Sequence, residues 1–89
     1  MQNARRDLVD SLYGREPETL TVLRLMVGLS QARLAEMIGT SQPHIARIEG
    51  GRTDPGTEMI AKLARALAVN EQRAFAAIRQ QRIGREKIR

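Results

Sequence analysis

The residues of this sequence that are best suited to specific chemistry lie close together, within residues 41–49. A glutamine side chain such as Gln42 can form two hydrogen bonds with the edge of an adenine, and an arginine such as Arg47 can do the same with a guanine. Pro43 offers an apolar surface of the kind that contacts the methyl group of a thymine. Side chains of these types on one short segment indicate recognition of base edges.

The rest of the sequence offers little material for catalysis or for binding a metal ion. Cysteine is absent, His44 is the single histidine, and there is neither a paired-carboxylate spacing with a base nor a glycine-rich phosphate loop after a strand. We therefore expect no enzyme activity, no cofactor and no metal site. For His44 we favour contact with a phosphate, or plain exposure to solvent, over titration or metal binding.

The charge of the chain is positive but unevenly placed. Fifteen Lys and Arg residues against ten Asp and Glu residues give a net charge of +5, which favours a polyanionic partner such as nucleic acid. Residues 57–89 hold the whole excess, with eight basic and three acidic side chains. Within them the cluster from Arg79 to Arg89 is either a solvated end of the chain or a phosphate contact, and both interpretations stay open.

Apolar spacing predicts an all-α fold, a compact bundle of five or six helices, because no segment alternates with the period of two that strands need. We expect a first helix over residues 4–13, a second from Pro17 to Gly28 and a third between Ser30 and Gly39. A fourth should follow a cap at Thr40 or Ser41 and end at Gly50. A fifth should begin at Pro55 behind an Asp54 cap, and a sixth should follow an Asn70 cap. The residues expected to pack inward from Pro17 onward are Leu20, Leu23, Val27, Leu34, Ala35, Ile38, Ile45, Ile48, Met59, Ile60, Leu63, Ala64, Leu67, Phe75 and Ile78. After Gly84 the sequence is charged and lacks an apolar period, so we expect the end of the chain to fray.

These elements divide the chain into an N-terminal helical extension (residues 1–16), a central domain (17–69) and a C-terminal helix with a basic tail (70–89). The sequence shows no signal-peptide pattern and no apolar run long enough to span a membrane. The absence of cysteine fits a reducing compartment. We therefore expect a cytoplasmic protein.

Three positions within residues 31–50 have physical requirements that are hard to meet by accident. Ala35 lies where two short helices must cross closely, and Gly39 lies at the tight turn between them, where φ is expected to be positive. Ile45 returns the apolar side of the second helix to the first. The second helix, about 10–12 Å across, fits the major groove of B-DNA, which is about 12 Å wide.

From Leu20 to Val69 the sequence resembles the Cro and cI type (XRE family) of helix-turn-helix DNA-binding domain. The matching stretches are LTVLRLMVGLSQ (20–31), LAEMIG (34–39), SQPHIARIEGG (41–51), DPG (54–56) and IAKLARAL (60–67). The resemblance implies a lambda-repressor-like fold with a recognition helix over residues 41–49. The pair Gly50-Gly51 departs from the pattern and suggests a more flexible loop after that helix.

The resemblance and the residue types together assign roles to individual side chains. Base reading is expected from Ser41, Gln42, Pro43 and Arg47. Contact with phosphates is expected from Gln31, Thr40, His44, Gly51, Arg52 and Thr53. The resemblance also implies that Gln31 steadies the recognition helix, and that Arg24 and Glu49 form a partly buried structural ion pair.

The function that these features indicate is transcriptional regulation, with repression as the favoured output. One short helix reads too few base pairs for useful specificity, so we expect a homodimer on a pseudo-palindromic operator with half-sites about 34 Å apart. The first helix and the residues after Val69 are the two candidate dimer surfaces. The alternative is an antitoxin or antiactivator that acts mainly by binding a partner protein.

Overall fold

The computed structural model describes the backbone of residues 18–88 and the side chains of residues 18–82. Within these residues the chain forms five helices and no strand, which confirms the all-α prediction. They are α2 (Leu20–Met26), α3 (Gln31–Ile38), α4 (Gln42–Glu49), α5 (Thr57–Leu67) and α6 (Glu71–Ile88). The helix expected over residues 4–13 and the helix start expected at Pro17 lie outside the described residues.

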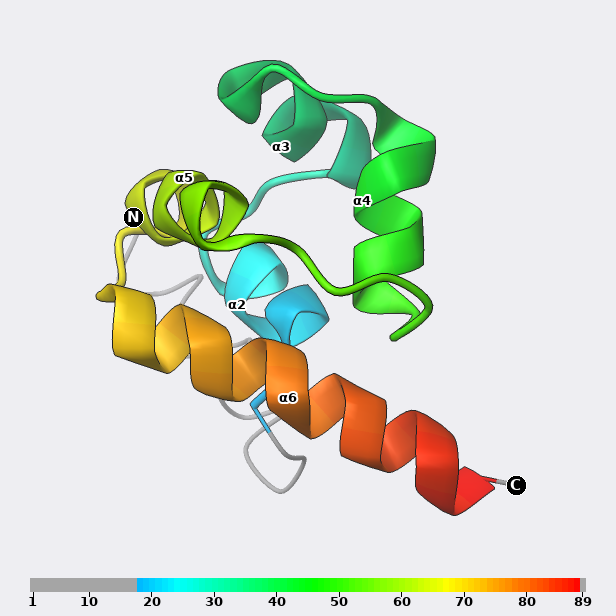
Figure 1. The fold of residues 1–89 in the computed structure, drawn as a ribbon. Helices are drawn as coiled ribbons and strands as arrows, with labels where there is room; N and C mark the ends of the chain where they lie inside the picture. Colours follow the sequence, from blue (N-terminus) through cyan, green and yellow to red (C-terminus); the bar gives the residue numbers. More distant parts are fainter. Residues whose placement is uncertain (1–17, 89) are drawn as a thin grey trace.

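The helices surround a single apolar core with α2 near its centre (Figure 1). Helix α3 packs against α4 and α5, while the long α6 runs along the opposite side and contacts α5, α2 and α4. The largest fully buried side chains are Leu20, Leu34, Ile45, Ile48, Leu63 and Leu67. Because α6 adds Ala74, Ala77 and Ile78 to the same core, the C-terminal helix is part of the body that carries α4.

Four helices begin with a side-chain cap that accepts a hydrogen bond from the backbone N–H group three residues further on. The capping residues are Thr19, Ser30, Ser41 and Asn70. Each cap satisfies one of the N–H groups that the first turn of a helix leaves without a partner. The predicted cap at Asn70 is confirmed, and Ser30, after which a helix was expected, caps α3. Of the two residues proposed for the start of α4, it is Ser41 that caps the helix.

The turn between α3 and α4 depends on Gly39. Its φ angle is +74°, and the N–H of Thr40 donates to the carbonyl of Ala35 at 2.9 Å, which closes the end of α3. A Cβ added at Gly39 would meet nothing within 4 Å. The glycine is therefore required by the left-handed backbone conformation and not by lack of space.

The predicted start of α5 at Pro55, behind an Asp54 cap, is wrong. The helix begins at Thr57, behind Gly56, whose backbone is extended. The carboxylate of Asp54 instead accepts two hydrogen bonds from Arg82 of α6, at 2.7 and 2.8 Å, so it does not cap the helix.

Three further expectations about the helices are also wrong. Val27 is 43% exposed because α2 ends one residue before it, and Phe75 is 49% exposed because α6 turns Ala74 and Ile78 toward the core instead. The segment after Gly84, which was expected to fray, is helical as far as Ile88. No helix in the described part of the chain is both long enough and apolar enough to cross a membrane.

Candidate nucleic-acid interface

Helices α3 and α4 form a compact unit that buries one side of α4 and leaves the other open. Ile45 and Ile48 are fully buried, and Ala35 is buried on the facing helix. The side chains of α4 and its cap that were expected to read bases are all exposed: Ser41, Gln42, Pro43 and Arg47. The unit therefore presents one continuous outer face of α4 to solvent.

The end of α4 is held by a carboxylate that accepts four hydrogen bonds. Glu49 accepts from the Nε and Nη2 atoms of Arg24 (2.7 and 3.1 Å), from the hydroxyl of Thr21 (2.8 Å) and from the amide of Gln31 (3.0 Å). The Arg24 and Glu49 side chains are only 11% and 5% exposed. Arg24 also donates to the carbonyl of Leu29, in the loop between α2 and α3, at 2.8 Å. Because Gln31 of α3 donates to the same carboxylate, the buried ion pair joins α2, α3 and α4.

Thr21 is not among the residues predicted from the sequence, although a signal for it exists. It lies three residues before Arg24 on α2, and side chains at that spacing share one face of a helix. A hydroxyl on the same face as a buried arginine is placed to reach the same carboxylate.

Gln31 links this buried carboxylate to the exposed start of α4. Since an ionised carboxylate only accepts, Gln31 must give its Nε2 to Glu49, and this orients its oxygen toward Gln42. The Nε2 of Gln42 donates to that oxygen at 2.7 Å. The structure thus holds the amide of Gln42 in one orientation through a chain of hydrogen bonds that ends in the core.

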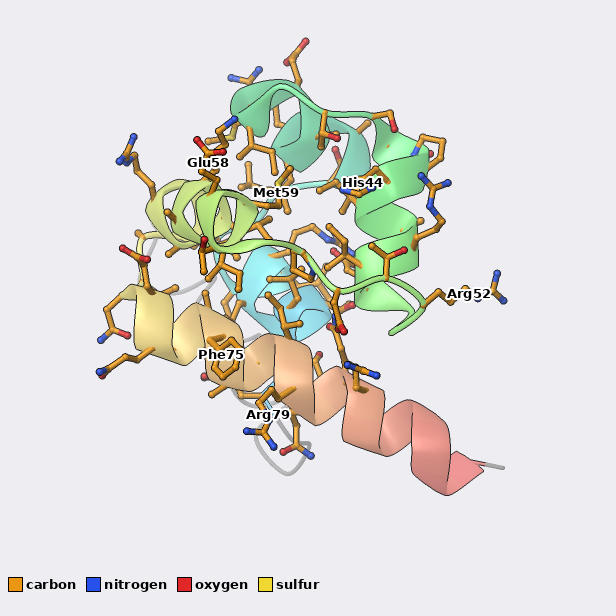
Figure 2. The ribbon with its side chains drawn as sticks, viewed as in Figure 1. His44, Arg52, Glu58, Met59, Phe75 and Arg79 are labelled. Carbon is orange, nitrogen blue, oxygen red and sulfur yellow. The ribbon has the colours of Figure 1, made fainter. Side chains whose placement is uncertain are left out.

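The loop after α4 is closed by its own backbone. The N–H of Gly51, whose φ is +73°, donates to the carbonyl of Ile48 at 3.1 Å, and the N–H of Arg52 donates to that of Arg47 at 3.0 Å. Arg52 points away from the body of the protein (Figure 2). A surface hollow of about 410 Å³ lies beside it, lined by Ala46, Arg47, Gly50 and Arg52.

The remaining residues that were expected to contact phosphate are less exposed. Thr40 and Thr53 are half-buried at the two ends of the α4 segment. His44 is also half-buried and extends from α4 on the side of α5, whereas Arg52 extends outward (Figure 2). The structure therefore does not place His44 with the outward-facing side chains of α4.

A buried glutamine of α6 was not predicted, and it joins the ends of two other helices. The Oε1 of Gln81 accepts from the N–H of Leu20, at the start of α2, at 3.2 Å. Its Nε2 donates to the carbonyl of Ile48, in the last turn of α4. Both are helix-end groups that lack a partner within their own helix. A glutamine within a charged segment carries no sequence signal that distinguishes this role from a solvated surface residue.

Two ion pairs complete the attachment of α6. Arg82 holds Asp54, in the loop between α4 and α5, and Arg73 binds the carboxylate of Glu18 at 2.6 and 2.9 Å. The pKa of Glu18 is lowered below its ordinary value of 4.5, chiefly because Arg73 donates hydrogen bonds to the charged carboxylate. Among the side chains of residues 18–82, no three histidines, aspartates or glutamates gather as a metal site would require.

The comparison with known proteins agrees with this geometry. Residues 22–73 match the model of a helix-turn-helix family, and the chain belongs to this family, which is of the Cro and cI type. A Haemophilus influenzae protein, named as an uncharacterized HTH-type transcriptional regulator, is 46% identical to this chain over 44 residues. The matched segment is 49% of this chain and 45% of that relative, so the likeness spans less than half of the relative's length.

Proposed function

We propose that this protein is a transcription regulator that binds double-stranded DNA and reads its sequence in the major groove with the outer face of α4. The family assignment supports DNA binding in general, and the name of the Haemophilus relative supports regulation of transcription. The observation that supports base reading by α4 is the hydrogen bond from Gln42 to Gln31, because it fixes an exposed amide at the start of α4.

The geometry of Gln42 favours adenine as the base that it reads. An amide group has two N–H donors and one oxygen acceptor, and Gln31 uses one of the donors. One donor and one acceptor remain side by side on Gln42, which is the pair that bonds to N7 and N6 of adenine. Gln31 itself keeps a second N–H that is available for a phosphate oxygen.

The neighbouring side chains extend this reading along the groove. Arg47 lies five residues after Gln42 on the exposed side of α4 and suits a guanine, while Pro43 suits a thymine methyl. We assign phosphate contacts to the helix start at Thr40 and Ser41 and to the loop after α4. In that loop Gly51 brings the backbone close to a phosphate, although its N–H already donates to the carbonyl of Ile48. Arg52 offers a positive charge that no acidic side chain of residues 18–82 pairs with.

Two copies of the chain are needed for useful specificity. Helix α4 has eight residues, so it reads only a few base pairs. A homodimer on a pseudo-palindromic operator, with half-sites one helical turn (about 34 Å) apart, doubles the sequence that is read. A dimer bound in this way covers the operator and blocks other proteins from it, which makes repression the simplest output.

Selection of bound sequences from a random pool of DNA duplexes tests this proposal directly. We expect the full chain to enrich a two-fold symmetric site whose half-sites are centred about 10 base pairs apart and contain an adenine. A Gln42→Ala, Arg47→Ala double variant serves as the control and should lose the consensus while keeping weak, salt-sensitive binding. Absence of any enriched sequence would contradict DNA reading, and a single unpaired half-site would contradict the dimer.

A further inference from the structure

An aromatic side chain stands exposed on α6, next to a hollow in the surface. Phe75 is 49% exposed, and Figure 2 shows it together with Arg79 on the outer side of the helix. The guanidinium of Arg79 lies 6.0 Å from the centre of the Phe75 ring. The adjoining hollow measures about 440 Å³ and is lined by Asp54, Pro55, Ile60, Phe75, Ile78, Arg79 and Arg82. A single exposed aromatic side chain is common on protein surfaces, so the case for a partner here depends on the hollow beside the ring and on the charges around it.

The charges on the same face of α6 are arranged symmetrically about Phe75. Glu71 lies four residues before it and Arg79 four residues after it, so the three side chains occupy one face of the helix. Glu71 and Arg79 are eight residues, or about 12 Å, apart along the axis and do not meet within one chain. Neither forms an ion pair with another residue between 18 and 82.

We propose that this face binds a second copy of the chain through an antiparallel pair of α6 helices that cross at Phe75. In such a pair, a residue that lies four positions before the crossing point faces the partner residue that lies four positions after it. Glu71 then faces the partner's Arg79, and two-fold symmetry forms this ion pair twice. Each Phe75 ring packs into the hollow beside the partner's Phe75.

The position of the hollow suits a dimer that binds DNA. Asp54 and Pro55 form part of its wall, and they follow directly after Arg52 and Thr53 in the loop beyond α4. Arg82 of α6 holds Asp54 in place. The pairing surface therefore adjoins the loop to which we assign phosphate contacts, as expected where two α4 helices enter neighbouring turns of one groove.

The size of this face predicts a weak dimer that DNA strengthens. Stable interfaces bury about 800 Å² on each partner, whereas one aromatic side chain buries about 150–250 Å². Because two half-sites hold two copies close together, the effective concentration on DNA is high. This inference rests on the proposed homodimer and specifies the surface through which it forms.

Reciprocal charge reversal tests the pairing of Glu71 with the partner's Arg79. Glu71→Arg and Arg79→Glu each place like charges opposite one another twice per dimer, so each should raise the dimer dissociation constant about tenfold or more in sedimentation equilibrium of the full chain. Combined in one chain, the two reversals restore opposite charges across the interface and should return the constant to within about threefold of the original. Since the two residues do not meet within a chain, rescue can arise only between copies.

Phe75→Ser tests the apolar part, with Met37→Ser as the matched control, because Met37 is 46% exposed on α3. On the selected operator, the Phe75→Ser variant should lose cooperative binding. On a duplex with one half-site scrambled, the same variant should bind as tightly as the unmodified chain. Met37→Ser should change neither. These readouts separate loss of the dimer surface from loss of DNA reading.

Several results would overturn the inference. They are failure of the double reversal to restore dimerisation, no effect of either single reversal, cooperative binding that survives Phe75→Ser, or a one-to-one complex of this face with a different protein. If the reversals behave as predicted in solution but no DNA sequence is selected, the dimer surface stands and the proposed DNA reading fails.

Discussion

The side-chain amide of Gln42 donates a hydrogen bond of 2.7 Å to the side-chain amide of Gln31, which in turn donates to the buried carboxylate of Glu49. An exposed side chain at the start of α4 is therefore connected to the ion pair of Glu49 with Arg24 at its end. The connection passes through α3, so both ends of α4 are fixed against the same neighbour. If α4 reads bases as we propose, a helix held in this way loses little conformational entropy on binding.

The buried ion pair should dominate the polar contribution to stability. Replacing Arg24 with Met leaves the Glu49 carboxylate buried without its guanidinium, which should lower the free energy of unfolding by about 3–5 kcal/mol in urea titrations. The control is Arg33→Ala, because the Arg33–Glu36 pair is 60% and 69% exposed and should contribute less than about 1 kcal/mol. Equal effects of the two substitutions would contradict a buried pair.

Gln81 should matter for stability although its sequence context looks like surface. In a Gln81→Met variant the N–H of Leu20 loses its acceptor, while the Ile48 carbonyl keeps its bond from Gly51. We expect a loss of about 1–3 kcal/mol, measured by urea unfolding. The exposed Gln72, changed to Met in the same way, should stay within about 0.5 kcal/mol of the original chain. An unaffected Gln81→Met variant would show that the amide is not needed.

The sequence predicts features that depend on neighbouring residues better than those that depend on distant ones. Caps and turns are local, so Ser30 and the positive φ of Gly39 follow from neighbouring residues alone. Asp54 also looks like a cap locally, but Arg82, 28 residues further on, takes its carboxylate. Phe75 is a residue type that is usually buried in a core, and only the packing of α6 on α5 shows that its side chain lies on the outer side of α6.

The residues of the candidate site likewise fall into those that the pattern of α4 predicts and those that depend on distant contacts. The exposure of Gln42 and Arg47 follows from the apolar period of α4, because Ile45 and Ile48 fix which side is buried. The half-buried position of His44 depends on the neighbouring helices, which the period of one helix does not describe. Gln81 acts through bonds to distant segments, and short-range patterns contain no trace of such bonds. Thr21 also bonds to a distant segment, and its only sequence signal is its spacing from Arg24 on one face of α2.

Salt dependence should separate arginines that contact DNA from those used within the protein. Arg52 is exposed and unpaired among the described residues, so Arg52→Gln should reduce the slope of log K against log salt by about one. Arg82→Gln should leave the slope unchanged, because Arg82 binds Asp54. Deletion of residues 80–89 is a poor substitute, since it removes the buried Gln81. Equal slopes for Arg52→Gln and the original chain would remove Arg52 from the interface.

The pair of Glu18 with Arg73 should make stability depend on pH at the acidic end. The pKa of Glu18 is lowered in the folded chain, so its contribution is fully present above the ordinary value of 4.5 and is lost as the pH falls through the lower folded value. Urea unfolding between neutral pH and about pH 3 should show a shallower decline for Glu18→Gln than for the original chain. Parallel curves would contradict a lowered pKa.

The most direct test of the central claim compares base preferences of the original chain and of Gln42→Ala at every position of the selected half-site. We predict that the original chain prefers adenine at one position by about 1–3 kcal/mol, and that Gln42→Ala loses this preference there alone while it keeps the others and its fold. Unchanged preferences at all positions would contradict base reading by α4 through Gln42, as would a uniform loss of affinity with every preference retained.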